Sequence, residues 1–216
     1  MTRRGSAGWR GVVLAATIGL AAMGCGSFNT RKPEPPSDEP VVQFLPTTNP
    51  QNVLTNIMAG IQGYASSNYR RSLTSDFRYI PPVTDPQLAS ELGPFLPWDF
   101  AKEDPLWRQV LKDARTPSPV ATVITWTWGE ASLVSVEGSD NRVYFDDLPY
   151  ECRFQRGAAS KVYSGEVDLY LIEVSGAYSV YRWEDIQDDS GNQTLGWLRA
   201  EREVFPSTSS LGVTNP

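Results

Sequence analysis

The sequence predicts an α+β fold, in which helices lie on one face of an antiparallel β-sheet. Two patterns predict it. Up to about residue 115, the main apolar segments repeat at the three-to-four-residue spacing of helices. From residue 120 onward, apolar side chains recur at every second position, which is typical of strands. Helices that precede a run of strands favour a sheet with its helices segregated to one side.

The first helix is expected to begin at Pro50. Asn49 precedes it and is a residue type that caps the free amides at a helix start, while proline fits the first turn. Apolar residues then continue at helical spacing as far as Tyr64. A second, short helix is predicted over residues 68–73.

A strand is predicted over residues 77–80, where two prolines close it. Residues 84–98 form a proline-rich connection. Asp104 and Pro105 then repeat the capping signal and predict a second long helix. Its apolar stripe consists of Leu106, Trp107, Val110, Leu111 and Ala114.

The second half of the chain predicts a series of strands. They are expected to cover residues 120–128, 148–155, 166–174, 178–184 and 195–204. The strand over 166–174 has apolar residues on both faces, so we expect it to be covered on both sides. Residues 188–192, Asp-Asp-Ser-Gly-Asn, predict a tight turn before the last strand.

Residues 1–24 have the three parts of a secretory signal peptide. Three arginines precede an apolar run of about 13 residues, which is shorter than the roughly 20 that a membrane-spanning helix needs. The run ends at Ala22-Met23-Gly24-Cys25, which resembles the bacterial lipoprotein box. The resemblance implies cleavage before Cys25 and acylation of that cysteine, so that lipid chains hold the protein on a bilayer. An ordinary cleaved signal and an uncleaved anchor are the alternatives.

The lipoprotein resemblance also implies a place in the bacterial cell envelope. Lipoproteins retained in the inner membrane usually carry Asp after the cysteine, whereas this chain has Gly26. The outer membrane is therefore favoured if the organism has two membranes. Residues 25–44 are expected to be the lipidated cysteine and a disordered, proline-rich tether. Residues 45–206 then form the domain, and residues 207–216 a polar tail.

Composition excludes several classes of function. Removal of residues 1–24, with three arginines and no acid, takes the formal charge from −6 to −9, and so acidic a domain is not expected to bind nucleic acid. The chain has no histidine, which excludes Ser-His-Asp and Cys-His catalysis and His-ligated zinc. With Cys25 acylated, Cys152 is the remaining thiol, and a buried small apolar residue is favoured over a reactive group. No cofactor, metal site or catalytic residue is predicted.

Several segments resemble the nuclear transport factor 2-like superfamily. They are Asn49-Pro50, Asn68-Tyr69-Arg70-Arg71-Ser72-Leu73, Ser75-Asp76-Phe77, Ser164-Gly165-Glu166-Val167, Tyr181-Arg182-Trp183-Glu184-Asp185 and Leu195-Gly196-Trp197-Leu198-Arg199-Ala200. The resemblance covers residues 50–203. It implies a SnoaL-like or ketosteroid-isomerase-like cone, in which N-terminal helices pack on a strongly curved antiparallel sheet. The superfamily includes a ketosteroid isomerase, a scytalone dehydratase and an epoxide hydrolase, but none of their catalytic sets is matched here residue by residue.

Five aromatic residues are candidates for lining a ligand cavity inside the cone. They are Trp126, Trp128, Tyr150, Phe154 and Trp183. Aromatic residues that alternate along strands also form ordinary cores, which is the alternative interpretation. The acidic stretch from Glu184 to Asp189 lacks the regular oxygen spacing of a calcium loop, so a turn is favoured there over a cation site.

The sequence therefore predicts a lipid-anchored envelope protein whose domain binds an apolar small molecule or a protein partner without catalysis. The alternative is a small-molecule isomerase or hydratase that uses carboxylate and tyrosine groups. A carboxylate beside a tyrosine hydroxyl in an open cone would favour the enzyme. A cone filled by tryptophan and phenylalanine side chains would favour the binding role.

Overall fold

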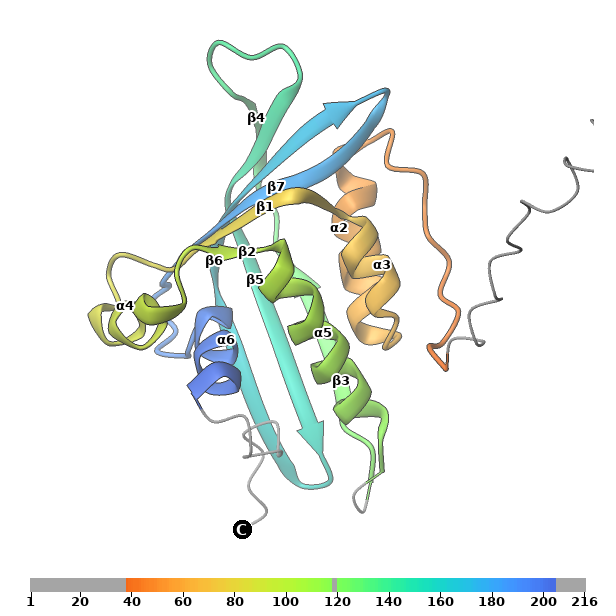
Figure 1. The fold of residues 1–216 in the computed structure, drawn as a ribbon, viewed down its shortest axis with the longest axis vertical. Coiled ribbons are helices and arrows are strands. Elements are labelled where there is room, and N and C mark those ends of the chain that lie inside the picture. Colours follow the sequence, from red (N-terminus) through yellow and green to blue (C-terminus); the bar gives the residue numbers. More distant parts are fainter. Residues whose placement is uncertain (1–37, 118–119, 205–216) are drawn as a thin grey trace, which may run out of the picture. The chain divides into compact units, whose positions relative to one another are not determined.

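As predicted, two helices, a strand and a long helix precede a series of strands, but the last element is a helix (Figure 1). The computed structural model describes residues 38–117 and 120–204. The helices are α2 (Pro50–Gln62), α3 (Ser66–Arg71), α4 (Pro86–Leu92), the 3₁₀ helix η1 (Gly93–Phe95), α5 (Phe100–Arg115) and α6 (Leu195–Val204). The strands are β1 (Leu73–Ile80), β2 (Trp98–Asp99), β3 (Val123–Trp128), β4 (Ser132–Ser135), β5 (Arg142–Arg156), β6 (Ala159–Val174) and β7 (Ala177–Ile186).

The strands form one curved sheet that stays open. Their order is β2-β1-β7-β6-β5-β3, and β4 adds a further pairing to β5. Within the described ranges, the edge strands β2 and β3 do not pair with each other, so the sheet does not close. The α+β class is confirmed, but the sheet is mixed rather than wholly antiparallel. The exception is β1, which runs parallel to β7 and places Tyr79 beside Trp183.

The first helix begins where the sequence predicts. Helix α2 starts at Pro50, and the side chain of Asn49 accepts a hydrogen bond from the amide of Gln51 at 2.9 Å. Most of its apolar stripe is buried, with Val53, Ile57 and Ile61 at 0% exposure. At about 1.5–3 kcal/mol for each buried aliphatic side chain, this packing rather than helix propensity holds α2 in place.

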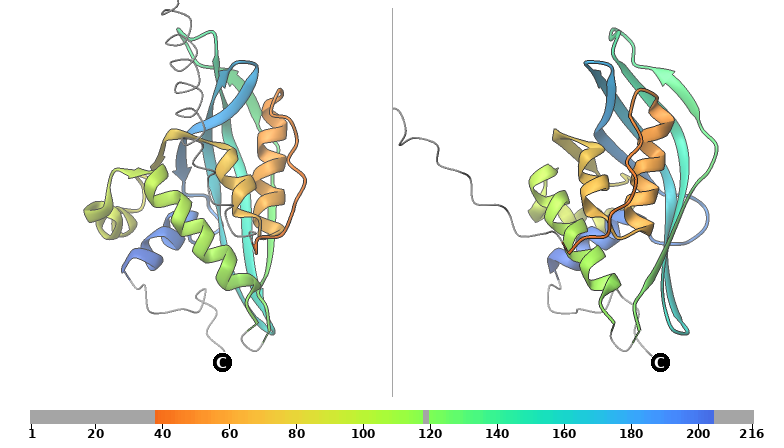
Figure 2. Two further views of the ribbon diagram at one scale, coloured as in Figure 1. Left: turned by 45° about the vertical axis from the view of Figure 1, so that its right-hand side comes forward. Right: turned by 90° about the vertical axis from the view of Figure 1, so that its right-hand side faces the viewer.

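Helices α2, α3 and α5 lie along one face of the sheet (Figure 2). The inward side chains of the strands meet them and form a single core. Four of the largest buried side chains are tryptophans: Trp98, Trp107, Trp126 and Trp183. The interior that these helices and strands enclose is therefore largely aromatic.

The largest differences between prediction and structure concern three segments. Residues 195–204, expected to be a strand, form helix α6, in which Leu195, Leu198 and Arg199 are buried at helical spacing. The strong turn before them favoured a hairpin, but the segment packs across the sheet and does not extend it. The connection over 84–98 contains α4 and η1, and α5 begins at Phe100 with Pro105 inside it.

Residues 39–46, which we call the N-terminal strap, lie against α2 and α3. The side-chain amide of Asn56 pairs with the backbone N–H and C=O of Leu45 at 2.8 and 2.9 Å. Asn68 donates to the carbonyls of Val42 and Gln43. Residues 39–44 were predicted to belong to the tether, but these contacts join them to the compact unit that starts at Glu39.

The export signal, Cys25 and the polar tail lie outside the described residues. Of the helices that are described, none has the length and apolar character that crossing a bilayer requires.

Candidate functional site

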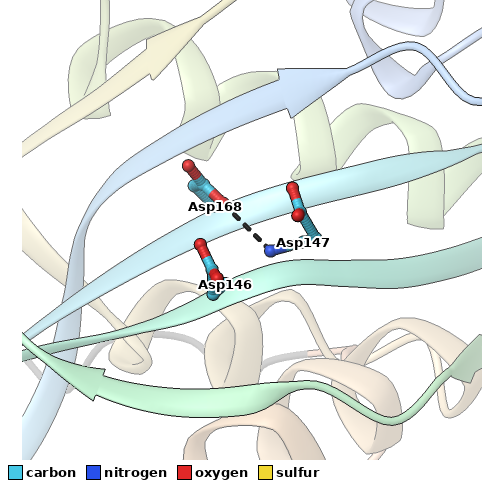
Figure 3. A group of neighbouring side chains, drawn as sticks. All are labelled: Asp146, Asp147 and Asp168. Atoms are coloured by element: carbon cyan, nitrogen blue, oxygen red, sulfur yellow. Dashed lines mark hydrogen bonds between the residues drawn. The ribbon is translucent and has the colours of Figure 1, made fainter.

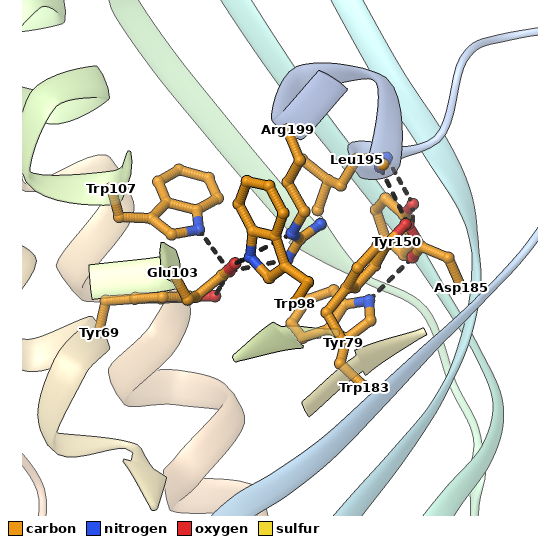
Figure 4. A network of polar contacts seen from close by, with 11 residues as sticks. Tyr69, Tyr79, Trp98, Glu103, Trp107, Tyr150, Trp183, Asp185, Leu195 and Arg199 are labelled. Atoms are coloured by element: carbon orange, nitrogen blue, oxygen red, sulfur yellow. Dashed lines mark hydrogen bonds and ion pairs between the residues drawn. The ribbon is translucent and has the colours of Figure 1, made fainter. Parts of the chain in front are cut away.

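A carboxylate lies at the centre of the domain, on helix α5. Glu103 is 0% exposed and accepts five hydrogen bonds from four side chains (Figure 4). Tyr69 and Trp107 donate to Oε1 at 2.5 and 2.9 Å, and Trp98 donates to Oε2 at 2.6 Å. Arg199 binds both oxygens, with Nε at 3.0 Å from Oε2 and Nη2 at 2.7 Å from Oε1. This bidentate contact is the strongest type of ion pair.

A second buried carboxylate, Asp185 on β7, has its own set of donors. Tyr79 and the backbone N–H of Gly196 donate to Oδ2 at 2.8 and 3.1 Å. Tyr150 and Trp183 donate to Oδ1 at 3.0 and 2.8 Å. The Tyr150 hydroxyl in turn accepts from the N–H of Leu195. The two carboxylates and the groups around them form one network, which we call the interior network (Figure 4).

The guanidinium of Arg199 connects the two halves of the interior network. It pairs with Glu103 and lies 3.8 Å above the ring centroid of Tyr79, whose hydroxyl binds Asp185. Arg199 is 1% exposed, so its charge is fully removed from water. One of its nitrogens, Nη1, has no hydrogen-bond partner within the described chain.

Burial and charge shift the pKa values of this network in different directions. Burial by itself raises the pKa of Glu103, but Arg199 and the surrounding donors outweigh it and hold the pKa below its usual range. For Asp185, burial dominates and raises the pKa, although Arg199 and three side-chain donors oppose it. The hydroxyls of Tyr79 and Tyr150 have strongly raised pKa values, first because they are buried and then because Asp185 is near. Both tyrosines therefore stay neutral donors.

Helix α6 covers the interior network from the C-terminal side. It supplies Arg199 and the backbone amides of Leu195 and Gly196. Gly196 is required there, since a Cβ at this position would meet the Tyr79 hydroxyl and would lie 2.6 Å from Leu88. Three features therefore hold α6 against the interior network: the charge of Arg199, the backbone amides of Leu195 and Gly196, and the close packing at Gly196.

Four of the five aromatic residues predicted to line a cavity lie together. The ring centroid of Trp126 is 4.9 Å from Trp128, 5.9 Å from Tyr150 and 6.2 Å from Trp183. These rings contact one another inside the cone, and Trp128 is the member that reaches the surface in part. The buried Nε1 of Trp126 has no hydrogen-bond partner within the described chain.

The other predicted residues lie apart from this group. Phe154 is buried and packs edge-on against Tyr163 at 5.8 Å. Cys152 is 0% exposed, and burial raises the pKa of its thiol well above the usual value. Arg153 and Glu151 form an exposed ion pair on the outer face. The burial of Cys152 agrees with the small apolar role favoured from the sequence.

The acidic stretch after β7 divides between the interior and the surface. Asp185 belongs to the interior network, whereas Asp188 accepts from the amide of Ser190 at 3.0 Å in the turn that follows. A different acidic group lies on the outer face of the sheet (Figure 3). There, carboxylate oxygens of Asp146, Asp147 and Asp168 lie within 4.8 Å of one another. An acidic cluster alone does not define a metal site, and we assign none.

The sequence contained partial signals for the residues that it failed to identify. Glu103 is one helical turn before Trp107, on the apolar stripe of α5. Asp185 is two residues after Trp183 and so shares its inward face on the strand. A carboxylate at an inward position predicts a buried partner. Arg199 could not be predicted as that partner, because its segment was assigned to the wrong type of element.

Comparison with known proteins supports the fold. No protein-family model and no curated protein sequence matches the chain. A naphthalene 1,2-dioxygenase structure with indole in its active site matches 68% of this chain and 81% of its own, at a TM-score of 0.53 and 12% identity. An NTF2-like protein from Cytophaga hutchinsonii matches 64% and 94%, at a TM-score of 0.45 and 7% identity. ActVI-ORFA from Streptomyces coelicolor matches 64% and 93%, at a TM-score of 0.45 and 14% identity.

These likenesses concern the architecture of helices on a curved sheet. The chain has that α+β architecture, and the dioxygenase match, with a TM-score above 0.5, supports it. What the interior can do chemically follows from its own contacts. To act as a general base, a carboxylate needs an oxygen within hydrogen-bond reach of a substrate proton. In Glu103 and Asp185, every oxygen already accepts at least two hydrogen bonds from the chain.

Proposed function

We propose that the protein is a lipid-anchored lipoprotein of the bacterial envelope, whose domain binds a partner without catalysis. The observation that supports the non-catalytic role is the saturation of both interior carboxylates by donors from the chain itself. Glu103 and Asp185 are 0% and 3% exposed. Removing a bound donor from a buried carboxylate costs more than the new contact returns, so a substrate would compete poorly for these oxygens.

The same interior favours a protein partner over an apolar small molecule. The rings of Trp126, Trp128, Tyr150 and Trp183 present their surfaces to one another at centroid distances of 4.9–6.5 Å. Such ring contacts are favourable in themselves, by about 0.5–1.5 kcal/mol per pair beyond area burial. An apolar ligand would have to separate them before it could bind.

Native mass spectrometry of residues 39–216 tests whether the interior holds a small molecule. The expected result is a mass with no adduct of small-molecule size. Such an adduct, if it dissociates on denaturation, would contradict the preference for a protein partner. Its chemical conversion by the protein would in addition support the second candidate, which is acid–base chemistry on a small molecule. That candidate has one specific observation in its favour: Asp185 has a raised pKa and lies between the hydroxyls of Tyr79 and Tyr150. If it is correct, Asp185→Asn abolishes the conversion.

The anchor is tested separately in cells. Cys25→Ala should leave unprocessed precursor or release the protein into the soluble fraction, and it should abolish labelling by an alkyne fatty acid. The matched control is Cys152→Ala, which removes the chain's other cysteine and should leave labelling and membrane association unchanged. A mature-sized, membrane-bound and labelled Cys25→Ala protein would overturn the lipoprotein proposal.

A further inference from the structure

Strand β4 gives the sheet an edge that the described helices leave open. It lies where the sheet extends beyond α2, and within the described chain it pairs with β5 alone (Figures 1 and 2). The amide of Val136, just after β4, donates to the carbonyl of Arg142 on β5. Because backbone groups alternate in direction along a strand, the N–H and C=O groups of Leu133 and Ser135 point away from β5. No hydrogen bond from another part of residues 38–117 or 120–204 reaches these groups.

The neighbouring edge strand, β3, is capped by groups from the helical side of the domain. The carbonyl of Trp126 accepts from Gln62 Nε2 at 2.5 Å, and the carbonyl of Thr122 accepts from the Tyr64 hydroxyl at 2.8 Å. The amide of Thr122 donates to the carbonyl of Ala114 on α5. Covering an edge in this way keeps other chains from pairing with it. The edge of the sheet is therefore covered along β3 but open along β4.

The side chain of Leu133 continues the apolar face of the core onto this open edge. Leu133 lies directly opposite Phe145 on β5, so both side chains are on the inner face of the sheet. Phe145 is 1% exposed, whereas Leu133 is 46% exposed. A strand added beside β4 would place one of its own side chains against Leu133 and cover it.

Acidic residues surround the open edge. Glu130 and Glu137, each two residues from an end of β4, are exposed, and so is Asp146, which pairs with the first residue of β4. Arg142 turns toward β7, where its guanidinium lies 5.1 Å from the ring centroid of Tyr181. Antiparallel pairing of β4 with a second copy would bring Glu130 beside Glu137, and like charges in that position are destabilising. A basic segment is attracted instead.

We propose that β4 binds an extended, basic segment of the protein partner by strand addition. The segment pairs its backbone with Leu133 and Ser135, places an apolar side chain over Leu133, and carries lysine or arginine at both ends. Glu130 and Glu137 are seven positions apart, so about seven residues of the partner, at roughly 3.3 Å each, span the site. In such complexes the main-chain hydrogen bonds give affinity, and alternate side chains give specificity. This inference rests on the protein-binding function proposed above and names its surface.

A basic peptide of alternating sequence, Lys-Lys-Val-Thr-Val-Thr-Val-Lys-Lys, is the probe for residues 39–216. Fluorescence anisotropy of the labelled peptide is expected to show binding that weakens as the salt concentration rises. N-methylation of its valines or of its threonines removes the amides along one edge or the other of the extended peptide. One of these two peptides should bind at least about ten-fold more weakly, and the other should bind like the unmodified peptide. Equal binding by both, or no binding by the unmodified peptide, would overturn the proposal.

Variants of the protein locate the site. Leu133→Pro removes an amide that faces the open edge and none that bonds to β5, so the fold should persist while binding weakens at least about ten-fold. The double variant Glu130→Lys, Glu137→Lys should weaken binding of the basic peptide equally and should bind the counterpart that has glutamate in place of lysine. Asp76→Lys, which changes an exposed acid on β1, is the matched control and should alter neither affinity more than about two-fold.

Residue-resolved hydrogen exchange identifies the backbone groups involved. The bound peptide should slow exchange at the amides of Leu133 and Ser135 and leave that of Val134, which points toward β5, unchanged. Binding that protects neither amide, or that survives both protein variants, would overturn the proposal. Circular dichroism confirms that the variants are folded. None of these outcomes bears on Cys25 or on the interior, so failure here is distinguishable from failure of the anchor or of the non-catalytic role.

Discussion

Glu103→Gln is expected to destabilise the folded domain by about 3–5 kcal/mol, the usual cost of breaking a buried ion pair from one side. The amide keeps one accepting oxygen and replaces the other with a donor. Because Oε1 and Oε2 accept three and two hydrogen bonds, at least two buried donors then lose their acceptor. At about 1–3 kcal/mol for each unsatisfied group, this independent estimate covers the same range. Arg199 also loses the carboxylate with which it forms its buried ion pair.

Urea unfolding of residues 39–216 measures the change, provided that the slope of the transition stays constant. For a domain of this size, the melting temperature should fall by roughly 6–20 °C. Arg108→Ala serves as the control on the same helix, because its ion pair with Asp104 is exposed and is worth only about 0–0.5 kcal/mol. A Glu103→Gln protein as stable as Arg108→Ala would refute the reasoning, since the five donors would then have other acceptors.

Three further predictions concern the same interior. The raised pKa of Asp185 contributes stability that is complete below the unfolded pKa of about 4 and is lost as pH rises through the folded value. The stability advantage of wild type over Asp185→Asn, measured by urea unfolding between pH 3.5 and 7, should therefore decrease with rising pH. An increase would contradict this prediction. Gly196→Ala should lower the free energy of unfolding by about 1–3 kcal/mol in the same assay, despite alanine's better helix propensity, because the added methyl meets Tyr79 and Leu88. A stabilised variant would show that α6 is not closely packed. Cys152 should resist a thiol reagent in the native protein and react fully in denaturant, since burial excludes the reagent and raises the thiol pKa; rapid native labelling would disprove its burial.

The sequence predicted the elements whose local pattern agrees with their tertiary role. Asn49 and Pro50 start α2 as expected, because capping involves only neighbouring residues. The alternation of Ile124 and Trp126 with exposed threonines predicts strand β3 and its inward face. In both cases, the hydrophobic period and the local backbone preferences indicate the same structure.

The sequence did not predict pairings between distant residues. Helix α6 was expected to be a strand because the turn before it is typical of hairpins, while its helical spacing extends over only 10 residues. The parallel pairing of β1 with β7 depends on how the intervening helices fold back. No local sequence pattern predicts how those helices fold back.

In the interior too, local patterns were predictable and pairings between distant residues were not. From the sequence alone, five inward-facing aromatic residues could be placed in the cone, because strand periodicity fixes which face each occupies. The partnership of Glu103 with Arg199, which are 96 positions apart, was decided only when α6 folded across the sheet. A buried charge is stable only when its partners surround it, and in this chain those partners come from α3, β2, α5 and α6. The sequence determines which side chains face inward; the tertiary structure decides which of them meet.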